Sequence, residues 1–595
     1  MKILPSEEEK WKKYYLQDKK NNNKMDIVYN TIYDNNINYK HDIALEYFAN
    51  HISFANFFKN VEKTAKSFTE YGIKKWNFVT VCCAGIPEIA YTFYALSKIG
   101  AVSNMIAPYF DKNNLINRIS DCESDILIVM DIFYSELKEC IKKSRIKTII
   151  IIPTLNSALI KKPSCYKREK NSNELYWDNF IRDGKHNHNN NNYINYEENL
   201  PLAMVYSSGT TGASKGILLS NESFQNSVFS YPECGVDISR NQKFYQLIPP
   251  WYSTGLSTSL HLPLTYGCTV FMDPRFERNI FVKNIIKHKP NYTVAATSMY
   301  EGFLEKKLVG KHDLSFYNYP FEGGEPLRKE VADKIEEVFK EHGCNSKLRV
   351  AYGQCECGAA ITTQTQKMDA TFGSVGIPLP GIRVGIFDDE NNELSYNKRG
   401  NIYAATPCAM IGYYKNEEEN KKHFYVDKNG IKWSKTGDIG YLNNNGELFV
   451  SGRANDYSII NNKKIFNFDV ENIILSFNQI KNCDVFEKNG ILVMHLIPDK
   501  NYNKEELTRL IKQIQKSIFE VFKDLDYVPF VFKIRDTFPC AKSGKRDLIK
   551  LKSENEDFFT INNDKMENYI INENKKELKK RLNWSCKIKV DTKKI

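Results

Sequence analysis

Apolar residues in the first quarter of the chain alternate between two spacings, and this alternation constrains the fold more than any other feature. Residues 55–71 and 89–99 carry apolar side chains at helical spacing. By contrast, residues 78–83, 126–130 and 148–152 are short apolar runs of strand length. Strands that alternate with helices predict an α/β fold with a largely parallel sheet.

The length of the chain and a later change of pattern predict two domains and a tail. A chain of 595 residues is well above the roughly 150 residues of an average domain. After residue 446, short strand-like runs surround one amphipathic helix at 505–522. We predict a large N-terminal α/β domain of mixed β-sheets flanked by helices at 1–452. A small, mobile α+β C-terminal domain at 453–555 and a Lys/Asn-rich extension at 556–595 follow it.

The composition is typical of a folded protein with free thiols. Hydrophobic residues make up 42% of the chain, which is enough for large packed cores. The 14 cysteines include no CxxC pair, so free thiols in a reducing, cytoplasmic environment are predicted instead of a zinc site. The sequence contains no run of about 20 apolar residues, so we predict no membrane span. The net charge of +11 is mostly diffuse, so we predict a solvated surface and no nucleic-acid partner.

A loop rich in glycine and hydroxyl residues follows the apolar run at 202–205. Residues 206–216 read YSSGTTGASKG, which is not a Walker A sequence because GxxxxGK[ST] is absent. Glycines let backbone N–H groups surround an anion, while the hydroxyls add donors and the lysine adds positive charge. The loop therefore predicts a polyphosphate site. The residues expected to contact the polyphosphate are Ser207, Ser208, Gly209, Thr210, Thr211, Gly212 and Lys215.

This loop resembles the phosphate-binding motif of the acyl-adenylate-forming superfamily, which includes acyl-CoA synthetases, aryl-CoA ligases, luciferases and peptide-synthetase adenylation domains. The family usually has proline where Ser214 stands, and further motifs follow in the family's order up to about residue 548. The resemblance implies an AMP-forming acid–thiol ligase that uses ATP and Mg²⁺. Such an enzyme converts a carboxylic acid to acyl-AMP and pyrophosphate, then transfers the acyl group to coenzyme A and releases AMP.

Two motifs resemble the family's adenine and magnesium sites. GGEPL at 323–327 resembles the adenine-side loop, and YGQCE at 352–356 resembles the next motif. The resemblance implies that adenine stacks on Tyr352 and that Glu356 holds Mg²⁺, as suits an aromatic face and a hard carboxylate. The family commonly has threonine where Cys355 stands. The implied nucleotide contacts here are Gly324, Glu325, Pro326, Tyr352, Gly353, Gln354 and Cys355.

Three further motifs resemble the ribose site, the hinge and the catalytic loop. A TGD sequence ends at Asp438, and GRAND contains Arg453 and Asp456. The resemblance implies that Asp438 binds the ribose hydroxyls, that Arg453 contacts ribose or phosphate, and that Asp456 is the hinge. PCAKSGK ends at Lys545, which is implied to bridge the substrate carboxylate and the α-phosphate. Lys542 is a second candidate by charge, but its spacing favours it less.

The motif PPWYSTG at 249–255 resembles the segment that lines the acyl pocket. Tyr252 stands where many relatives have histidine and where amino-acid-activating members have aspartate. Because tyrosine cannot supply that negative charge, an α-amino acid is disfavoured. Small residues after the magnesium motif leave room for an apolar chain, so we predict a fatty or aryl acid. The predicted pocket residues are Tyr252, Gly255 and Gly358.

Three alternatives stay open from the sequence. The acyl group could pass to the pantetheine of a separate carrier protein. The chain could also be a non-catalytic nucleotide-binding descendant, because Ser214, Cys355, Asn455 and Leu548 depart from the family pattern. Finally, the basic tail could make peripheral contact with an anionic membrane, although a solvated tail is favoured.

Overall fold

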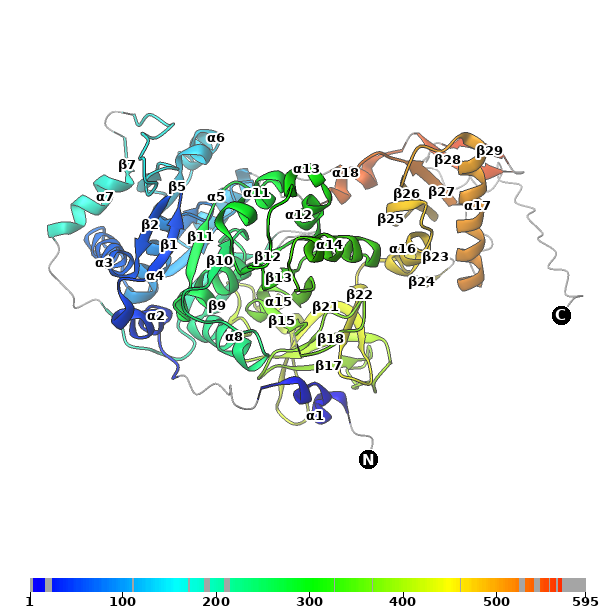
Figure 1. Ribbon diagram of the computed structural model, residues 1–595, viewed down its shortest axis with the longest axis horizontal. Coiled ribbons are helices and arrows are strands. Elements are labelled where there is room, and N and C mark those ends of the chain that lie inside the picture. Colours follow the sequence, from blue (N-terminus) through cyan, green and yellow to red (C-terminus); the bar gives the residue numbers. More distant parts are fainter. Residues whose placement is uncertain are drawn as a thin grey trace, which may run out of the picture. The chain divides into compact units, whose positions relative to one another are not determined.

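The computed structural model forms two compact units, and each is described by itself. The first comprises Met1–Thr436 and Gly440–Val450, and the second comprises Gly437–Ile439 and Ser451–Ile595. The structure (Figure 1) describes residues 4–16, 24–109, 112–169, 172–186, 193–207, 214–325, 327–365, 367–460, 462–523, 530–539, 546–555, 557–562 and 565–569.

The first unit contains an eight-stranded sheet of strand order β19-β9-β8-β4-β3-β5-β6-β7. Its strands are β3 (Phe78–Cys82), β4 (Val102–Met105), β5 (Ile126–Met130), β6 (Thr148–Ile152), β7 (Glu174–Tyr176), β8 (Pro201–Tyr206), β9 (Gly216–Ser220) and β19 (Gly412–Tyr413). The strands from β8 to β7 pair in parallel, whereas β8–β9 and β9–β19 are antiparallel. The predicted α/β class is confirmed, because the apolar runs became strands buried on both faces.

A second, nine-stranded sheet has the order β16-β15-β14-β13-β12-β10-β11-β1-β2. Its strands are β1 (Ile43–Tyr47), β2 (Asn50–Ser53), β10 (Lys243–Gln246), β11 (Thr269–Met272), β12 (Tyr292–Ala295), β13 (Tyr319–Glu322), β14 (Arg349–Gly353), β15 (Ala360–Thr363) and β16 (Ile377–Pro378). Figure 1 shows β1, from the start of the chain, beside β11. The parallel pair β13–β14 brings two predicted site motifs to the carboxyl edge of one sheet, where ligands bind in such folds.

A third sheet has the order β17-β18-β21-β20, and β22 also pairs with β21. These strands are β17 (Arg383–Phe387), β18 (Gly400–Ala405), β20 (Phe424–Val426), β21 (Lys432–Leu442) and β22 (Leu448–Arg453). The helices of the first unit are α1 (Pro5–Glu8), α2 (Val28–Asn36), α3 (Phe54–Glu70), α4 (Pro87–Ile99), α5 (Lys112–Asp121), α6 (Asp131–Ile141), α7 (Trp177–Asp183), α8 (Asn221–Glu233), α9 (Ser253–Leu256), α10 (Leu262–Thr265), α11 (Arg278–His288), α12 (Thr297–Tyr300), α13 (Lys306–Val309), α14 (Lys329–Glu341) and α15 (Glu417–His423).

The described part of the second unit combines a hairpin, a five-stranded sheet and three α-helices. The hairpin is β23 (Tyr457–Ile460) with β24 (Lys463–Phe466), and the sheet contains β25 (Ile480–Lys488), β26 (Ile491–Pro498), β27 (Phe530–Ile534), β28 (Phe558–Asn562) and β29 (Lys565–Tyr569). The helices are α16 (Asn467–Leu475), α17 (Lys504–Val521) and α18 (Leu548–Ser553). The sequence did not predict β28 and β29, which extend this sheet and bury Phe558.

Among the described residues, no helix is both long enough and apolar enough to cross a membrane.

Candidate active site

The phosphate-loop motif begins where β8 ends and closes where β9 begins. The N–H of Ser207 donates to the carbonyl of Lys215 (3.1 Å), and the N–H of Lys215 donates to the Ser207 hydroxyl (3.0 Å). The Ser214 hydroxyl donates to the Ser207 carbonyl at 2.5 Å. A side-chain hydrogen bond therefore fixes the neck of the loop at the position where the family has proline. The predicted residues 208–212 lie outside the described residues.

Lys215 and Glu356, two of the predicted site residues, are connected through Tyr413. The Lys215 ammonium forms an ion pair with Glu419 and lies 4.8 Å from the centre of the Tyr413 ring. The hydroxyl of Tyr413 donates to Oε1 of Glu356 at 3.1 Å. We call Lys215, Tyr413 and Glu356 together the tyrosine bridge. It joins a cation of the phosphate loop to the carboxylate predicted to hold Mg²⁺.

The charges around the tyrosine bridge follow from burial and from nearby ions. Hydrogen bonding to Lys215, and then to Lys422, lowers the pKa of Glu419 to about 2. Burial, followed by the charge of Glu356, raises the pKa of Tyr413 above its usual range. Burial, followed by the charge of Lys215, lowers the pKa of His423 to about 4. At neutral pH the site therefore holds an ionised Glu419, a protonated Tyr413 phenol and a neutral His423.

The surroundings of Glu356 fit a magnesium ligand. It lies in a short turn after β14, is partly exposed, and is held by the N–H of Met410, which donates to its main-chain carbonyl at 2.9 Å. Within the described ranges, no lysine or arginine forms an ion pair with its carboxylate. Those ranges also contain no group of three His, Cys, Asp or Glu side chains that could hold a metal. In nucleotide sites Mg²⁺ usually takes one or two carboxylates together with phosphate and water, and Glu356 suits that arrangement.

The adenine-side motif follows β13 directly. Gly324 has φ +95°, a backbone conformation that favours glycine. The carboxylate of Glu325 accepts the N–H of Ser298 (2.9 Å) and its hydroxyl (3.2 Å), so Glu325 ties this loop to α12. Pro326 lies outside the described residues. Glu322, which sequence reasoning missed, is buried just before the loop, and burial raises its pKa to about 8.

The next motif, at the end of β14, places its residues in different surroundings. Tyr352 is half-buried against the core, and Gly353 is exposed. A side chain at Gly353 would lie 1.9 Å from the carbonyl oxygen of Ala359, so this position requires glycine. Gln354 donates its amide to Cys357 Sγ at 3.7 Å, and Cys355 packs against the apolar core.

The predicted acyl-pocket motif forms a tight turn with an aromatic neighbour. The hydroxyls of Tyr252 and Tyr109 lie 2.7 Å apart, and the Tyr109 ring meets Trp251 edge-on at 5.9 Å. Sequence reasoning missed Tyr109. A side chain at Gly255 would come within 2.1 Å of the carbonyl oxygen of Pro249.

Gly358 is also constrained by packing. It has φ +85°, and a side chain there would approach the carbonyl oxygens of Cys408 (2.7 Å) and Ser223 (2.9 Å). The packing of these two backbones is thus a sufficient reason for glycine at this position.

The second unit holds the ribose and hinge motifs. Asp438 is buried, and its carboxylate lies 3.2 Å from Nε of Arg453. The Asp456 carboxylate accepts the side-chain amide of Asn467 at 2.7 Å. Asn462 has φ +63°, in the left-handed region that asparagine tolerates better than most residues. Lys542 and Lys545 lie outside the described residues.

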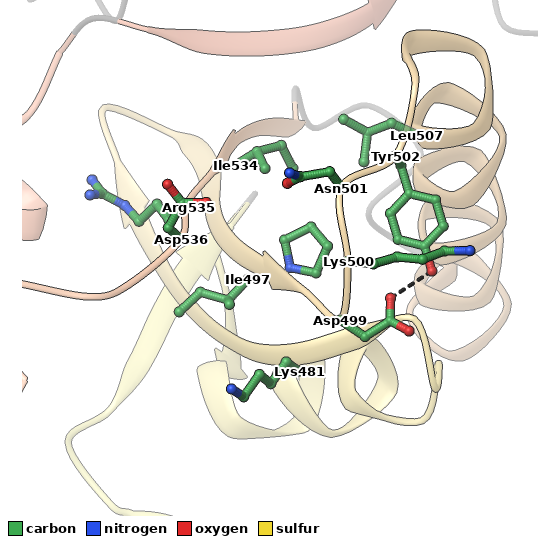
Figure 2. A pocket seen from close by; sticks show the side chains of 11 residues that line it. Lys481, Ile497, Asp499, Lys500, Asn501, Tyr502, Leu507, Ile534, Arg535 and Asp536 are labelled. Atoms are coloured by element: carbon green, nitrogen blue, oxygen red, sulfur yellow. Dashed lines mark hydrogen bonds between the residues drawn. The ribbon is translucent and has the colours of Figure 1, made fainter.

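The second unit also contains a cavity of about 320 Å³, which lies between the end of β26, the loop at 499–502 and the end of β27 (Figure 2). Tyr502 donates to Asp499 at 2.6 Å beside it. None of the predicted site residues lines this cavity. Its charged side chains are of both signs: Lys481, Asp499, Lys500, Arg535 and Asp536.

Comparison with known proteins assigns the family. The model of the AMP-binding enzyme family matches residues 34–414. The chain belongs to the AMP-binding enzyme family. It is 25% identical to probable 4-coumarate–CoA ligase 1 of Dictyostelium discoideum over an alignment of 434 residues. This alignment covers 71% of this chain and 76% of that protein. It is 23% identical over 546 residues to the long-chain-fatty-acid–CoA ligase of Bacillus subtilis (strain 168), covering 86% and 92%.

The fold is also similar to that of a solved CoA ligase. The crystal structure of the anthranilate CoA ligase AuaEII in complex with anthranoyl-AMP superposes with a TM-score of 0.72 at 18% identity, covering 89% of this chain and 97% of that one. At this identity the likeness establishes the fold alone.

The AMP-binding family motifs did not point to Tyr413 or Glu419. Both lie in the segment 412–423, which contains none of the motifs recognised in the sequence. The contact arises because β19 pairs with β9, so that Tyr413 lies opposite Ile217, two residues beyond Lys215. Two adjacent tyrosines after a glycine were the available local signal, and they do not distinguish Tyr413 from Tyr414.

Proposed function

We propose that this AMP-binding enzyme activates a fatty or aryl carboxylic acid with ATP and Mg²⁺ and passes the acyl group to coenzyme A. The observation that carries the proposal is the tyrosine bridge, because it joins a phosphate-loop cation to a carboxylate suited to Mg²⁺. The names of relatives that act on 4-coumarate and on long-chain fatty acids support the acid class and the acceptor.

The proposed reaction has two steps. In the first, an oxygen of the substrate carboxylate attacks the α-phosphorus of ATP, and the bond to the β-phosphate oxygen breaks to release pyrophosphate. In the second, the thiol sulfur of coenzyme A attacks the acyl carbon, the bond from this carbon to the phosphate oxygen of AMP breaks, and AMP leaves with that electron pair while the thiol proton passes to solvent. Bound Mg²⁺ supplies positive charge that neutralises phosphate oxygens. The positive charge of Lys215 stabilises the departing pyrophosphate. Lys545 draws the substrate carboxylate and the α-phosphate together.

The remaining nucleotide contacts belong to the same proposal. The phosphates lie in the loop that begins at Ser207, and adenine lies between the 323–327 loop and Tyr352. Asp438 holds the ribose next to Arg453, and the C-terminal domain rotates about Asp456 between the two steps. In support, the Asp438 carboxylate is buried and already pairs with Arg453.

An apolar acid suits the surroundings of Tyr252 better than an amino acid does. Its hydroxyl engages Tyr109, and the neighbouring Trp251 presents an aromatic edge. Burial raises the pKa of Tyr252, so the phenol stays neutral and supplies no negative charge to an α-ammonium group. A cytoplasmic location is part of the proposal, and the free thiols of the described cysteines support it.

The decisive experiment is acid-dependent ATP–pyrophosphate exchange with purified full-length protein and a panel of fatty, aryl and amino acids. We expect exchange with a fatty or aryl acid, followed by a coenzyme A thioester that mass spectrometry detects. Exchange driven by amino acids or acetate alone would overturn the substrate class. Exchange without any coenzyme A thioester would favour a carrier-protein acceptor, and nucleotide binding without exchange would favour a non-catalytic descendant.

A further inference from the structure

We propose that Tyr413 is a positioning residue that couples the phosphate-loop lysine to the carboxylate that holds Mg²⁺. The inference rests on the proposed function and concerns a residue outside all of the predicted motifs. Two contacts of one side chain carry it: the ring beneath the Lys215 ammonium at 4.8 Å and the hydroxyl bonded to Glu356 at 3.1 Å.

The backbone around Tyr413 holds its ring in a fixed place beside the loop. Strand β19 pairs with β9, and the N–H groups of Ile411 and Tyr414 donate to Leu218 and Gly216 at 2.8 Å each. The N–H of Tyr413 donates to the side-chain oxygen of Asn420 at 2.6 Å. Only 8% of the Tyr413 residue is exposed, so it cannot turn away without disturbing the core.

The ring and the hydroxyl of Tyr413 do different work. The aromatic face attracts the lysine ammonium, and such a contact stabilises the side chain in one position. The hydroxyl oxygen of Tyr413 lies 3.1 Å from Oε1 of Glu356, and a carboxylate oxygen is the acceptor in such a contact. The phenol therefore donates to the carboxylate, and a hydrogen bond from outside the metal's own ligands orients a ligand and tunes its metal affinity.

Glu356 is attached to the same short segment a second time. Its main-chain carbonyl accepts the N–H of Met410, three residues before Tyr413. Both the backbone and the side chain of Glu356 are thus held by residues 410–413, which also border the neck of the phosphate loop. Lys215 and Glu356 consequently keep a fixed relation to each other, as is needed if both act on one polyphosphate.

The test separates the ring from the hydroxyl. Equilibrium binding of α,β-methylene-ATP, which cannot be cleaved at the α-phosphorus, is measured across a range of Mg²⁺ concentrations. For Tyr413→Phe we expect the Mg²⁺ concentration at half-maximal binding to rise by about 10- to 100-fold. Its affinity for the analogue in EDTA should stay within about twofold of wild type, because the ring beneath Lys215 remains. For Tyr413→Leu, which lacks the aromatic ring, we expect the affinity for the analogue in EDTA to be about two- to fivefold lower than that of Tyr413→Phe.

Tyr414→Phe is the matched control. Its ring lies against Phe78 and Lys415, away from the tyrosine bridge, so its binding profile should be that of wild type. A wild-type Mg²⁺ dependence in Tyr413→Phe would overturn the inference. Equal losses in Tyr413→Phe and Tyr414→Phe would also overturn it, since they would report packing alone. Failure of the wild-type protein to bind the analogue at any Mg²⁺ concentration would instead refute the proposed function.

Discussion

Replacing Glu419 by glutamine should strengthen ATP binding, because it removes a charge that competes with phosphate for Lys215. The two side chains form an ion pair in which Lys215 is 33% and Glu419 27% exposed. A pair this exposed contributes about 0.2–1 kcal/mol, and ATP must break it to use the lysine. Removing it should therefore lower the dissociation constant of ATP by about 1.4- to 5-fold, while unfolding becomes easier by no more than about 1 kcal/mol.

The assay is titration of ATP at several salt concentrations and pH values. Because the pKa of Glu419 is lowered to about 2, the stability gained from its ionisation is present above pH 4.5 and lost as pH falls toward 2. The effect on ATP affinity should thus be constant between about pH 6 and 9, and it should shrink as the Debye length falls from about 10 Å at 0.1 M salt to about 3 Å at 1 M.

Glu418→Gln is the control for the same helix. Glu418 is 80% exposed and pairs with Lys422, so its removal should leave ATP affinity unchanged. Weaker ATP binding by Glu419→Gln would refute the reasoning, because it would mean that Glu419 holds Lys215 in its binding position.

Three further outcomes are expected. Gly358→Ala should lower the free energy of unfolding by about 2–4 kcal/mol, because Gly358 combines a positive φ with backbone atoms that a side chain would overlap. Gly430 has φ +79° but lies in open space, so Gly430→Ala should lower the free energy of unfolding by only about 1–2 kcal/mol. Equal melting temperatures of the two variants would contradict this. Burial raises the pKa of Glu322 from 4.5 to about 8, so the folded state holds a proton that the unfolded state releases and stability falls as pH rises between those values. Glu322→Gln should gain stability over wild type through that window by at most about 1.4 kcal/mol per pH unit, and parallel pH–stability curves would argue against it. Lys545→Ala should reduce adenylation by about 10²–10³-fold and thioester formation from preformed acyl-AMP much less, so equal losses in both steps would exclude its assigned role.

The first sheet was predictable because each of its central strands carries its own signal. The run that became β5 is apolar throughout, and the run that became β6 is apolar after its first residue, Thr148, as is typical of strands covered on both faces. The hairpin β28–β29 carries no such signal. Its strands read FFTIN and KMENY among many lysines, asparagines and glutamates, and β28 gains its place by pairing with the distant β27.

The site was predictable to the extent that its groups lie in continuous loops. Glycines and hydroxyls must be adjacent to surround a phosphate, so residues 206–216 could be recognised without a structure. The surroundings of Lys215 could not, because Tyr413 and Glu419 are about two hundred residues away and reach it only through the register of β9 and β19. Local sequence does not encode that register.

The departures from the family pattern carry different weight once their contacts are known. Proline at position 214 would restrict the neck of the loop through its ring, and Ser214 restricts it through a hydrogen bond to Ser207 instead. The Cys355 side chain packs against the apolar core, so the change from threonine removes a hydroxyl but leaves the turn that presents Glu356. A substitution that preserves the local contact is weak evidence for loss of activity. The case for catalysis therefore depends on whether Lys215 and Glu356 act on the same polyphosphate, and the two Tyr413 variants measure that coupling directly.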